Sequence, residues 1–459
     1  MSRLVVVSNR VAPIDEGQAA VGGLAVAVLA ALRETGGVWF GWSGETAAER
    51  QMTPTLTEQG GLTFATVDLT KRDIDEYYLG YANNVLWPLL HYRLDLTRFE
   101  RRNFLGYMRV NDRLARMLQP MLRPDDTIWV HDYHLIPLAR ALRQSGVRNR
   151  IGFFLHTPFP PPDILEALPR HVDILRALCD YDLVGFQTQS DLSSFRASVE
   201  TLVGGTLRDD GTLLAFGRSV RSDAFPIGLD AENVRRLAQR HDRSRVRQRL
   251  REGLHERSMI IGVDRLDYSK GLIGRFEAYR DLLDVNEDLH GKVTLMQIAP
   301  PSRADAYGYG EIRTELENLT GNINGRFADF DWVPLRYLNR SFSRDMLTCF
   351  YREAEVGLVT PLRDGMNLVA KEYVASQNPE NPGVLVLSQF AGAAAQMSDA
   401  LIVNPYDHDE IANALYRALH MPLRERRKRW RNMMDGLVSE DIHHWRKAFL
   451  GALADAVPA

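Results

Sequence analysis

The stretch Pro361-Leu362-Arg363-Asp364-Gly365-Met366-Asn367-Leu368-Val369-Ala370-Lys371-Glu372 decides the fold class of this chain. It follows a short apolar run over residues 355–360 that predicts a buried parallel strand, and it precedes a segment with helical spacing. The stretch is therefore predicted to be a strand-to-helix turn. In open α/β sheets such turns lie at the carboxyl ends of the strands, where the N-terminus of the next helix favours an anion.

Three residues of this stretch suit a nucleotide sugar. Asp364 is a carboxylate for a sugar hydroxyl, Gly365 allows close approach of the backbone, and Glu372 lies one to two helical turns on, within reach of a ribose diol. The alternative is that Asp364 caps the helix and Glu372 is solvated. The turn by itself does not separate these two interpretations.

Length and composition limit the classes of protein. A chain of 459 residues predicts two or three domains, and 45% hydrophobic with 25% charged residues is typical of a globular protein. The net charge of −3 gives no reason to expect a nucleic acid or an anionic membrane as partner. Any group of Lys and Arg residues that binds an anion must therefore be confined to a small part of the surface.

The two cysteines, Cys179 and Cys349, exclude a disulfide scaffold and a cysteine-rich zinc site. No apolar run approaches the ~18 residues of a membrane span, and the run at residues 4–7 is too short for the core of a signal peptide. These features predict a cytoplasmic protein that neither is secreted nor crosses a membrane.

Short β-rich runs alternate with helical stretches in two halves, which predicts two doubly wound parallel sheets. The expected strands of the first half lie near residues 4–7, 38–41, 62–67, 127–130, 151–155 and 183–186, followed by a hairpin at 212–216 and 220–225. A charged helix is expected over 231–254. The strands of the second half are expected at 258–263, 293–298, 331–333, 356–360, 384–387 and 401–403, and a helical tail interrupted at Gly436 follows.

Polar residues follow the expected strands of the first half. They are Ser8-Asn9-Arg10, His131-Asp132-Tyr133-His134 and His156-Thr157-Pro158, and the glycine pair of Gly22-Gly23-Leu24, before an expected helix, exposes backbone N–H groups to a phosphate or sugar oxygen. A metal is disfavoured, because the histidines lack the H-E-x-x-H spacing and the prolines after His156 stiffen its loop. Asp132 and His156 are better suited to sugar hydroxyls.

Cations follow the expected strands of the second half. Arg265 and Lys270 are five residues apart in one loop, a spacing that lets both converge on a diphosphate. The alternative is local ion pairing with Asp264 and Asp267, and the motif alone leaves both possibilities open. Arg303 is a third cation at a strand end.

Taken in order, the motifs resemble those of the trehalose-6-phosphate synthases. The matching segments are V-S-N-R, G-G-L, W-x-G-W-S-G, the Tyr77-Tyr78 pair, N-V-L-W-P, W-V-H-D-Y-H, F-F-L-H-T-P-F-P, V-D-R-L-D-Y-S-K-G and R-D-G-M-N-L-V-A-K-E-Y. The resemblance implies an α/β protein of the GT-B fold, with two Rossmann-like domains whose parallel sheets face a central cleft. It also implies transfer of glucose, with retention, from a nucleotide-diphosphate glucose, UDP-glucose by default, to glucose 6-phosphate.

The resemblance assigns residues to each substrate. The expected domains are an N-terminal acceptor domain (1–228), a C-terminal nucleotide-sugar domain (229–438) and a C-terminal helix (439–459) that packs back on the first domain. The donor diphosphate would meet Arg265, Lys270, Gly23 and the backbone of Asn367 and Leu368; Glu372 would bind the ribose, and Asp364 and His156 the glucose hydroxyls. The acceptor phosphate would meet Arg10, Tyr78 and Arg303, and the acceptor sugar Trp87 and Asp132.

The favoured mechanism is a front-face substitution, in which Arg265 and Lys270 stabilise the departing diphosphate and no metal or cofactor takes part. His156 and Asp364 complete the predicted catalytic set. The alternatives are a transferase with a glycerol phosphate or cyclitol phosphate acceptor, a catalytically silent nucleotide-sugar sensor, and a Rossmann oxidoreductase, which the missing G-x-G-x-x-G disfavours. A homo-oligomer is expected from the relatives.

Overall fold

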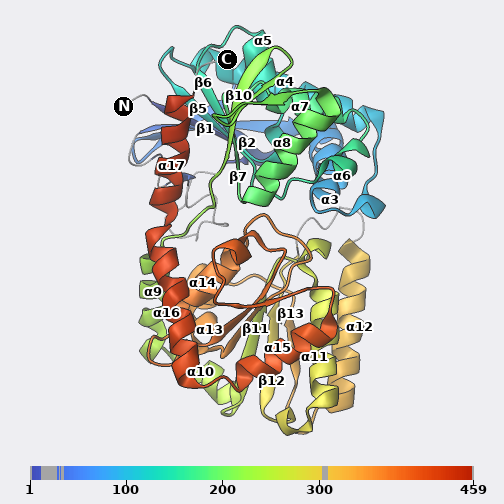
Figure 1. The fold of residues 1–459 in the computed structure, drawn as a ribbon, viewed down its shortest axis with the longest axis vertical. Helices are drawn as coiled ribbons and strands as arrows, with labels where there is room; N and C mark the ends of the chain where they lie inside the picture. The colour runs from blue at the N-terminus through green and yellow to red at the C-terminus, as the bar shows by residue number, and fades with distance from the viewer. Residues whose placement is uncertain (1–2, 12–27, 30–31, 33–35, 302–308, 457–459) are drawn as a thin grey trace. The chain divides into compact units, whose positions relative to one another are not determined.

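The computed structural model of the chain describes residues 3–11, 28–29, 32, 36–301 and 309–456 (Figure 1). The chain divides into two compact units. Unit 1 comprises Met1–Ile227 together with Trp445–Ala459, and unit 2 comprises Gly228–His444. Unit 1 is therefore discontinuous in sequence, since its last segment follows the whole of unit 2.

Unit 1 is built on a ten-stranded sheet with the order β3-β4-β2-β1-β5-β6-β7-β10-β9-β8. The strands are β1 (Leu4–Arg10), β2 (Gly37–Ala47), β3 (Thr55–Gln59), β4 (Leu62–Thr70), β5 (Thr127–His131), β6 (Arg150–Phe154), β7 (Leu183–Phe186), β8 (Thr206–Leu207), β9 (Thr212–Ala215) and β10 (Arg218–Ala224). Only the pairs β3–β4, β9–β10 and β8–β9 are antiparallel. The strand order reverses at β1, which lies between β2 and β5, so the loops after β1 and β5 flank a switch point where ligands bind in such sheets.

The helices of unit 1 connect its parallel strands and cover the sheet (Figure 1). The longer ones are the π-helix Ile74–Leu86, α4 (Arg101–Leu118), α5 (Leu138–Gln144), α7 (His171–Leu178) and α8 (Gln189–Val203); the shorter ones are α2 (Lys71–Asp73), α3 (Trp87–Leu90) and α6 (Pro162–Glu166). The last helix, α17 (Ile442–Asp455), begins in unit 2 and belongs to unit 1 from Trp445 onward.

Aromatic packing fixes α17 in the core of unit 1. Phe449 is fully buried and its ring stacks on Trp129 at 4.8 Å between centroids, while Phe225 meets it edge-on at 5.2 Å. Gly152 and Gly185 make room for this ring, because a Cβ on either glycine would lie within 2.9 Å of a Phe449 ring carbon. The segment after residue 445 thus completes the core of unit 1.

Unit 2 has a six-stranded, wholly parallel sheet with the order β13-β12-β11-β14-β15-β16. Its strands are β11 (Ser258–Val263), β12 (Val293–Ile298), β13 (Leu335–Leu338), β14 (Val356–Val359), β15 (Val384–Ser388) and β16 (Leu401–Val403). Its helices are α9 (Ala231–Arg240), α10 (Arg245–Leu254), α11 (Leu272–Val285), α12 (Tyr309–Phe327), α13 (Arg344–Glu353), α14 (Leu368–Ser376), α15 (His408–Leu419) and α16 (Leu423–Ser439). The order reverses at β11, so the loops after β11 and β14 flank the switch point of this sheet.

Several sequence-based boundaries are wrong. The expected strand at 331–333 is an irregular segment before Pro334, and the strand itself is β13. The helix expected over 231–254 is two helices, because the side chain of Ser244 accepts a hydrogen bond from the backbone N–H of Arg247 and starts α10 anew. In the tail, α16 runs through Gly436 and ends at Ser439. The edge strand β3 was not predicted.

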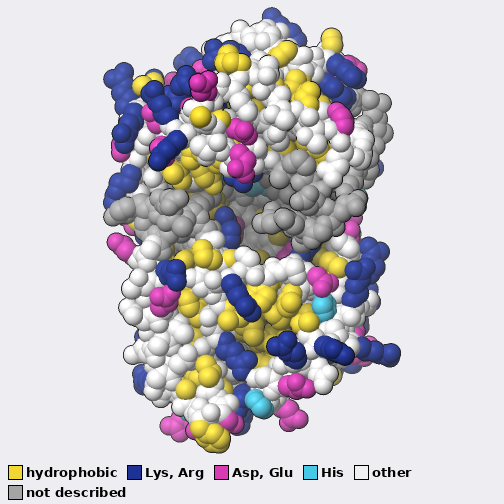
Figure 2. All heavy atoms as spheres, turned by 180° about the vertical axis from the view of Figure 1, so that it is seen from behind, with side chains coloured by type: hydrophobic (Ala, Val, Ile, Leu, Met, Phe, Trp, Pro, Cys, Tyr) yellow, Lys and Arg dark blue, Asp and Glu magenta, His cyan; other side chains and the backbone are white. Residues whose placement is uncertain are grey.

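The distribution of surface charge and the apolar length of the helices bear on whether the chain binds a nucleic acid or a membrane. On the face shown in Figure 2, Lys and Arg side chains are scattered among Asp and Glu over both units. Of the helices in the described part of the chain, none is both long and apolar enough to cross a membrane.

Candidate active site

The turn after β14 is a strand-to-helix connection, as the sequence predicts, and it leads into α14. Asn367 has a left-handed backbone (φ 74°), and its side-chain oxygen accepts a hydrogen bond from the N–H of Ala370 at 3.2 Å. Asn367 is therefore the cap of α14, and the interpretation of Asp364 as the capping residue is wrong. The carboxylate of Asp364 accepts hydrogen bonds from the amide of Asn367 (3.1 Å) and from Lys270.

Lys270 and Asp364 form an ion pair with 2.5 Å between Nζ and Oδ2. Their side chains are 10% and 16% exposed, so the pair is poorly solvated. The backbone N–H of Leu362 donates to the carbonyl of Ser269 at 2.8 Å, which ties the loop after β14 to the loop after β11. The two loops at the switch point of unit 2 thus hold a cation and a carboxylate side by side.

Asp264 and Asp267 accept hydrogen bonds from other groups, although the charge of Lys270 acts on Asp264 and opposes the rise that burial causes in its pKa. Asp264 accepts from Arg275 at 2.6 Å, and Arg275 is fully buried. The carboxylate of Asp267 accepts from the backbone N–H of Ser269 at 2.9 Å. Arg265 lies in the same loop with its side chain at the surface. Lys270 is therefore joined to the turn after β14, 94 residues further along the chain.

Glu372, on α14, is paired with Arg344 at the start of α13, with 3.1 Å between Oε1 and Nη2. Burial raises the pKa of Glu372, and the charge and hydrogen bond of Arg344 oppose that rise. The sequence did not single out Arg344. Its only sequence signal is its place after the helix-capping Ser343, which says nothing about a partner on another helix.

Lys371, next to Glu372, is 1% exposed. Its Nζ donates to the side-chain oxygen of Gln396 at 2.6 Å, and Gln396 in turn donates to Glu440. Burial lowers the pKa of Lys371 to about 7, although Glu440 opposes the shift.

In unit 1, the predicted acceptor residues Arg10 and Tyr78 are joined by Trp42. The guanidinium of Arg10 lies 4.6 Å from the centre of the Trp42 ring, and Tyr78 meets the same ring at 5.3 Å. Tyr78 also stacks on His134 at 5.8 Å. A cation at the end of β1 and a phenol within the π-helix are thus held together, and Trp42 and His134 join this predicted pair.

Trp87 and Asp132 also lie in unit 1. Trp87 is buried against His91, with 4.0 Å between the rings, and lies 5.8 Å from the ring of Tyr133. Asp132 directly follows β5 with a left-handed backbone (φ 74°), and its carboxylate accepts from the backbone N–H of His156 at 3.3 Å. The ends of β5 and β6 therefore bring Asp132 and His156 together.

His156 is half-buried and belongs to a hydrogen-bonded group at the ends of β5, β6 and β7. Its Nε2 lies 3.1 Å from Nδ1 of His131, and its Nδ1 lies 3.5 Å from the amide nitrogen of Gln187. Burial lowers the pKa of His156 to about 3 and that of His131 well below its ordinary value, so both rings are neutral. Two of the predicted residues, Gly23 and Arg303, lie outside the described residues.

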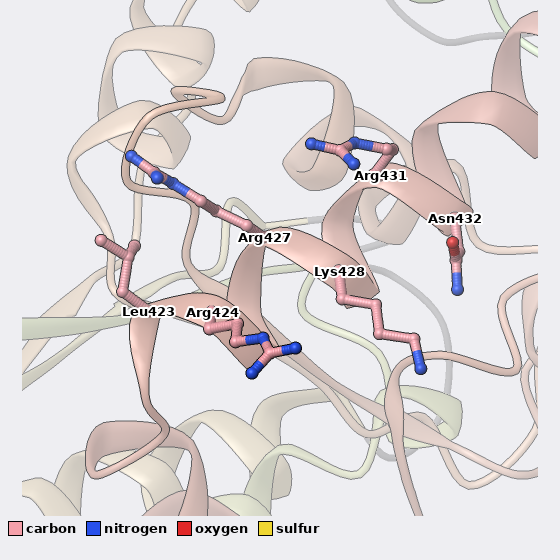
Figure 3. Close-up of a pocket in the computed structure, with 6 residues that line it drawn as sticks. All are labelled: Leu423, Arg424, Arg427, Lys428, Arg431 and Asn432. Atoms are coloured by element: carbon pink, nitrogen blue, oxygen red, sulfur yellow. The ribbon is translucent and has the colours of Figure 1, made fainter.

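Among the residues that the structure describes, no group of three or more His, Cys, Asp or Glu side chains is arranged to hold a metal ion. A surface pocket does occur on α16 (Figure 3). Its lining residues are Leu423, Arg424, Arg427, Lys428, Arg431 and Asn432. All six come from one helix and none from a strand-end loop, so this pocket is separate from the predicted site.

The chain belongs to glycosyltransferase family 20, whose family model matches residues 5–455. It is 52% identical over 458 residues to the trehalose-6-phosphate synthase of Escherichia coli K12, covering 100% of this chain and 96% of that protein. It is 52% identical, with a TM-score of 0.96, to a UDP-forming α,α-trehalose-phosphate synthase from Burkholderia xenovorans solved in complex with glucose-6-phosphate, over 99% of this chain and 100% of that chain. An E. coli structure bound with UDP-2-fluoro glucose is 51% identical, with a TM-score of 0.96 and complete coverage of both chains. The predicted family and the α/β GT-B fold class are confirmed.

Proposed function

We propose that this chain transfers glucose from UDP-glucose to glucose 6-phosphate, with retention, and releases trehalose 6-phosphate and UDP. The observation that carries the proposal is the Lys270–Asp364 pair at the switch point of unit 2, in a chain that matches trehalose-6-phosphate synthases over its whole length. Retention is the stereochemical course studied in one similar synthase, which is 50% identical to this chain.

The donor is proposed to bind on unit 2. Lys270 and Arg265 would face the diphosphate, and the backbone N–H groups at Asn367 and Leu368 would add the partial positive charge of the α14 N-terminus. Asp364 would hold a glucose hydroxyl. Further donor contacts are proposed from Glu372, on the ribose, and from Gly23.

The acceptor is proposed to bind on unit 1. A phosphate monoester needs cations and hydroxyl donors, which Arg10 at the end of β1 and Tyr78 within the π-helix would supply. Arg303 is proposed as a further phosphate contact. Trp87 and Asp132 would contact the sugar, and His156 would bind a hydroxyl of the transferred glucose.

A front-face substitution fits the surroundings of Asp364 better than a covalent intermediate. Its carboxylate already accepts from Lys270 and Asn367, which lowers its nucleophilicity and leaves it suited to positioning. In the proposed step the bond between C1 of glucose and the diphosphate oxygen breaks, and the acceptor oxygen bonds to C1 on the same face. The proton of the acceptor hydroxyl passes to the leaving diphosphate, whose charge Arg265 and Lys270 stabilise.

Replacing Lys270 by Ala tests this role. The expected result is a fall in kcat of roughly 10²-fold or more, because one preorganised charge stabiliser is lost. Lys292→Ala is the matched control, since Lys292 is exposed and precedes β12 at the opposite end of the same sheet. Near-normal turnover by the Lys270 variant would overturn the assignment.

Turnover with glucose 6-phosphate, a glycerol phosphate and a cyclitol phosphate, each with a panel of nucleotide-glucose donors, tests the substrates. Nucleotide release only with glucose 6-phosphate is expected. Release with another acceptor, or no release with any, would replace the proposal by a different transferase or by a sensor.

We further propose that the enzyme needs no metal or cofactor, is cytoplasmic and forms a homo-oligomer. The two buried, unpaired cysteines, Cys179 and Cys349, are consistent with a reducing compartment. Full activity in excess chelator is expected if no metal is needed. A mass in solution, measured by light scattering, of a multiple of the chain mass is expected for a homo-oligomer.

A further inference from the structure

A chain of hydrogen bonds in unit 1 connects four strand ends. The backbone N–H of Ile227, after β10, donates to the side-chain oxygen of Gln187, after β7, at 2.9 Å. The amide nitrogen of Gln187 lies 3.5 Å from Nδ1 of His156, and Nε2 of His156 lies 3.1 Å from Nδ1 of His131. Gln187 and His131 are 2% and 0% exposed and His156 is half-buried, so this series of hydrogen bonds is largely shielded from water.

Only one direction of hydrogen-bond donation is possible along this series, from Ile227 toward His131. The N–H of Ile227 can only donate, so the oxygen of Gln187 must face it and the NH₂ group must face His156. The NH₂ group also only donates, so Nδ1 of His156 carries no proton. Since the ring is neutral, its proton is on Nε2 and is donated to Nδ1 of His131.

The surroundings of His131 agree with this direction. Its proton is then on Nε2, which has no hydrogen-bond partner among the described residues and lies in an aromatic environment, with Trp129 4.5 Å from the ring centre. An N–H is compatible with the negative faces of aromatic rings, whereas a bare nitrogen lone pair would be repelled by them. The opposite direction would also set an N–H of His156 against the N–H groups of Gln187.

We propose that Gln187 and His131 are positioning residues that hold His156 in one neutral tautomer, with Nε2 protonated, so that its Nδ1 accepts a hydrogen bond from a hydroxyl of the transferred glucose. The inference rests on the proposed function, which brings that glucose to His156. Nδ1 has a single lone pair, so the sugar hydroxyl replaces Gln187 as its donor; the 3.5 Å contact with Gln187 is at the limit of a hydrogen bond and is readily exchanged.

Two consequences follow for the reaction. His156 supplies no proton to the leaving group, because its only N–H is donated to His131. It also selects a donor sugar whose hydroxyl can donate, so an ether or a deoxy centre at that carbon is rejected.

The tautomer is measured directly in the full-length wild-type protein. Nitrogen-15 labelled histidine gives ring-nitrogen NMR signals that distinguish protonated from unprotonated positions, and His131→Asn and His156→Asn variants assign them by loss of signal. Protonation of Nε2 and not Nδ1 in both rings is expected at neutral pH. A proton on Nδ1 of His156, or on both of its nitrogens, would overturn the proposal, and this readout does not depend on turnover.

Gln187→Glu tests the consequence for catalysis with a side chain of the same shape. One carboxylate oxygen still accepts from Ile227, while the other faces Nδ1 as an acceptor and draws a proton onto it. The expected kcat/KM for UDP-glucose falls roughly tenfold to hundredfold, because a hydrogen bond is lost and a hydroxyl is left facing a donor. The KM for glucose 6-phosphate should be unchanged, and the pH profile should gain an ionisation that wild type lacks.

Mono-deoxy analogues of the donor complete the test. With the analogue that lacks the hydroxyl held by His156, wild type and Gln187→Glu should have equal kcat/KM, and with the others the deficit should persist. Wild-type kcat/KM of the folded variant with UDP-glucose would overturn the proposal. Absence of turnover by wild type would instead refute the proposed function and leave the tautomer measurement valid.

Discussion

Replacing Arg344 by Leu should weaken UDP binding in a pH-dependent way. Arg344 is the ion-pair partner of Glu372, which is proposed to accept hydrogen bonds from the ribose hydroxyls. A carboxylate accepts both hydroxyl hydrogens, whereas a protonated carboxyl group loses part of that capacity. Burial raises the pKa of Glu372, so without Arg344 the neutral form gains population.

The size of the effect follows from the geometry of the pair. The two side chains are 23% and 17% exposed and 3.1 Å apart, so the contact is a partly buried, charge-assisted hydrogen bond of about 1.5–3 kcal/mol. Since 1.4 kcal/mol is a factor of ten, the Kd for UDP should rise roughly tenfold to hundredfold at neutral pH. Raising the pH ionises Glu372, so the affinity of the variant should recover toward that of wild type.

Isothermal titration of UDP across a range of pH, from mildly acidic to alkaline, measures this. Arg344→Lys keeps the charge and should bind with intermediate affinity, and Arg313→Leu removes an exposed cation of unit 2 as the matched control. In a Glu372→Gln background, Arg344→Leu should add little. The reasoning is refuted if Arg344→Leu binds UDP like wild type, or if its deficit is the same at every pH.

Two further predictions concern stability. Phe449→Ala removes a fully buried ring and should lower the free energy of unfolding by about 3–5 kcal/mol in urea denaturation, while the exposed Lys447→Ala on the same helix should change it by less than about 0.5 kcal/mol. An equal loss in both variants would contradict the packing described for α17. Burial lowers the pKa of Lys371 from 10.5 to about 7, so between these values the unfolded chain binds a proton that the folded chain does not, and stability should rise with pH. Lys371→Met should flatten that rise, and an unchanged slope in urea unfolding would exclude Lys371 as its source.

The sequence predicts strands that carry buried apolar residues, including the half-buried β4, β9 and β10, and misses the fully exposed β3. Strand β14 is an apolar run and is predicted, whereas all five residues of β3 are exposed and form a strand only because their backbone pairs with β4. The apolar pair Trp332-Val333 suggests a strand, but Trp332 is used instead to donate its indole N–H to the carbonyl of Val293. The apolar character of a short segment alone does not show whether it forms a strand or packs as an irregular segment.

For the site, the sequence identifies positions at strand ends but not the contacts between them. Lys270 and Asp364 are each recognisable as residues of a strand-end loop, yet their pairing depends on β11 and β14 being neighbours in the sheet. Arg344 and Gln187 carry no local signal, since each acts on a residue presented by another element. Whether a carboxylate caps a helix, pairs with a cation or binds a ligand depends on which residues the tertiary fold brings next to it.

The aromatic packing of α17 has a consequence for how the chain is made. The rings of Trp129 and Phe225 are synthesised early, but Phe449, which covers them, follows the whole of unit 2. At about 5–20 residues per second, the roughly 200 intervening residues delay the closing of this core by roughly 10–40 s. During that interval the aromatic surface formed by Trp129 and Phe225 stays uncovered, so the folding of unit 1 cannot be completed before the whole chain has been made.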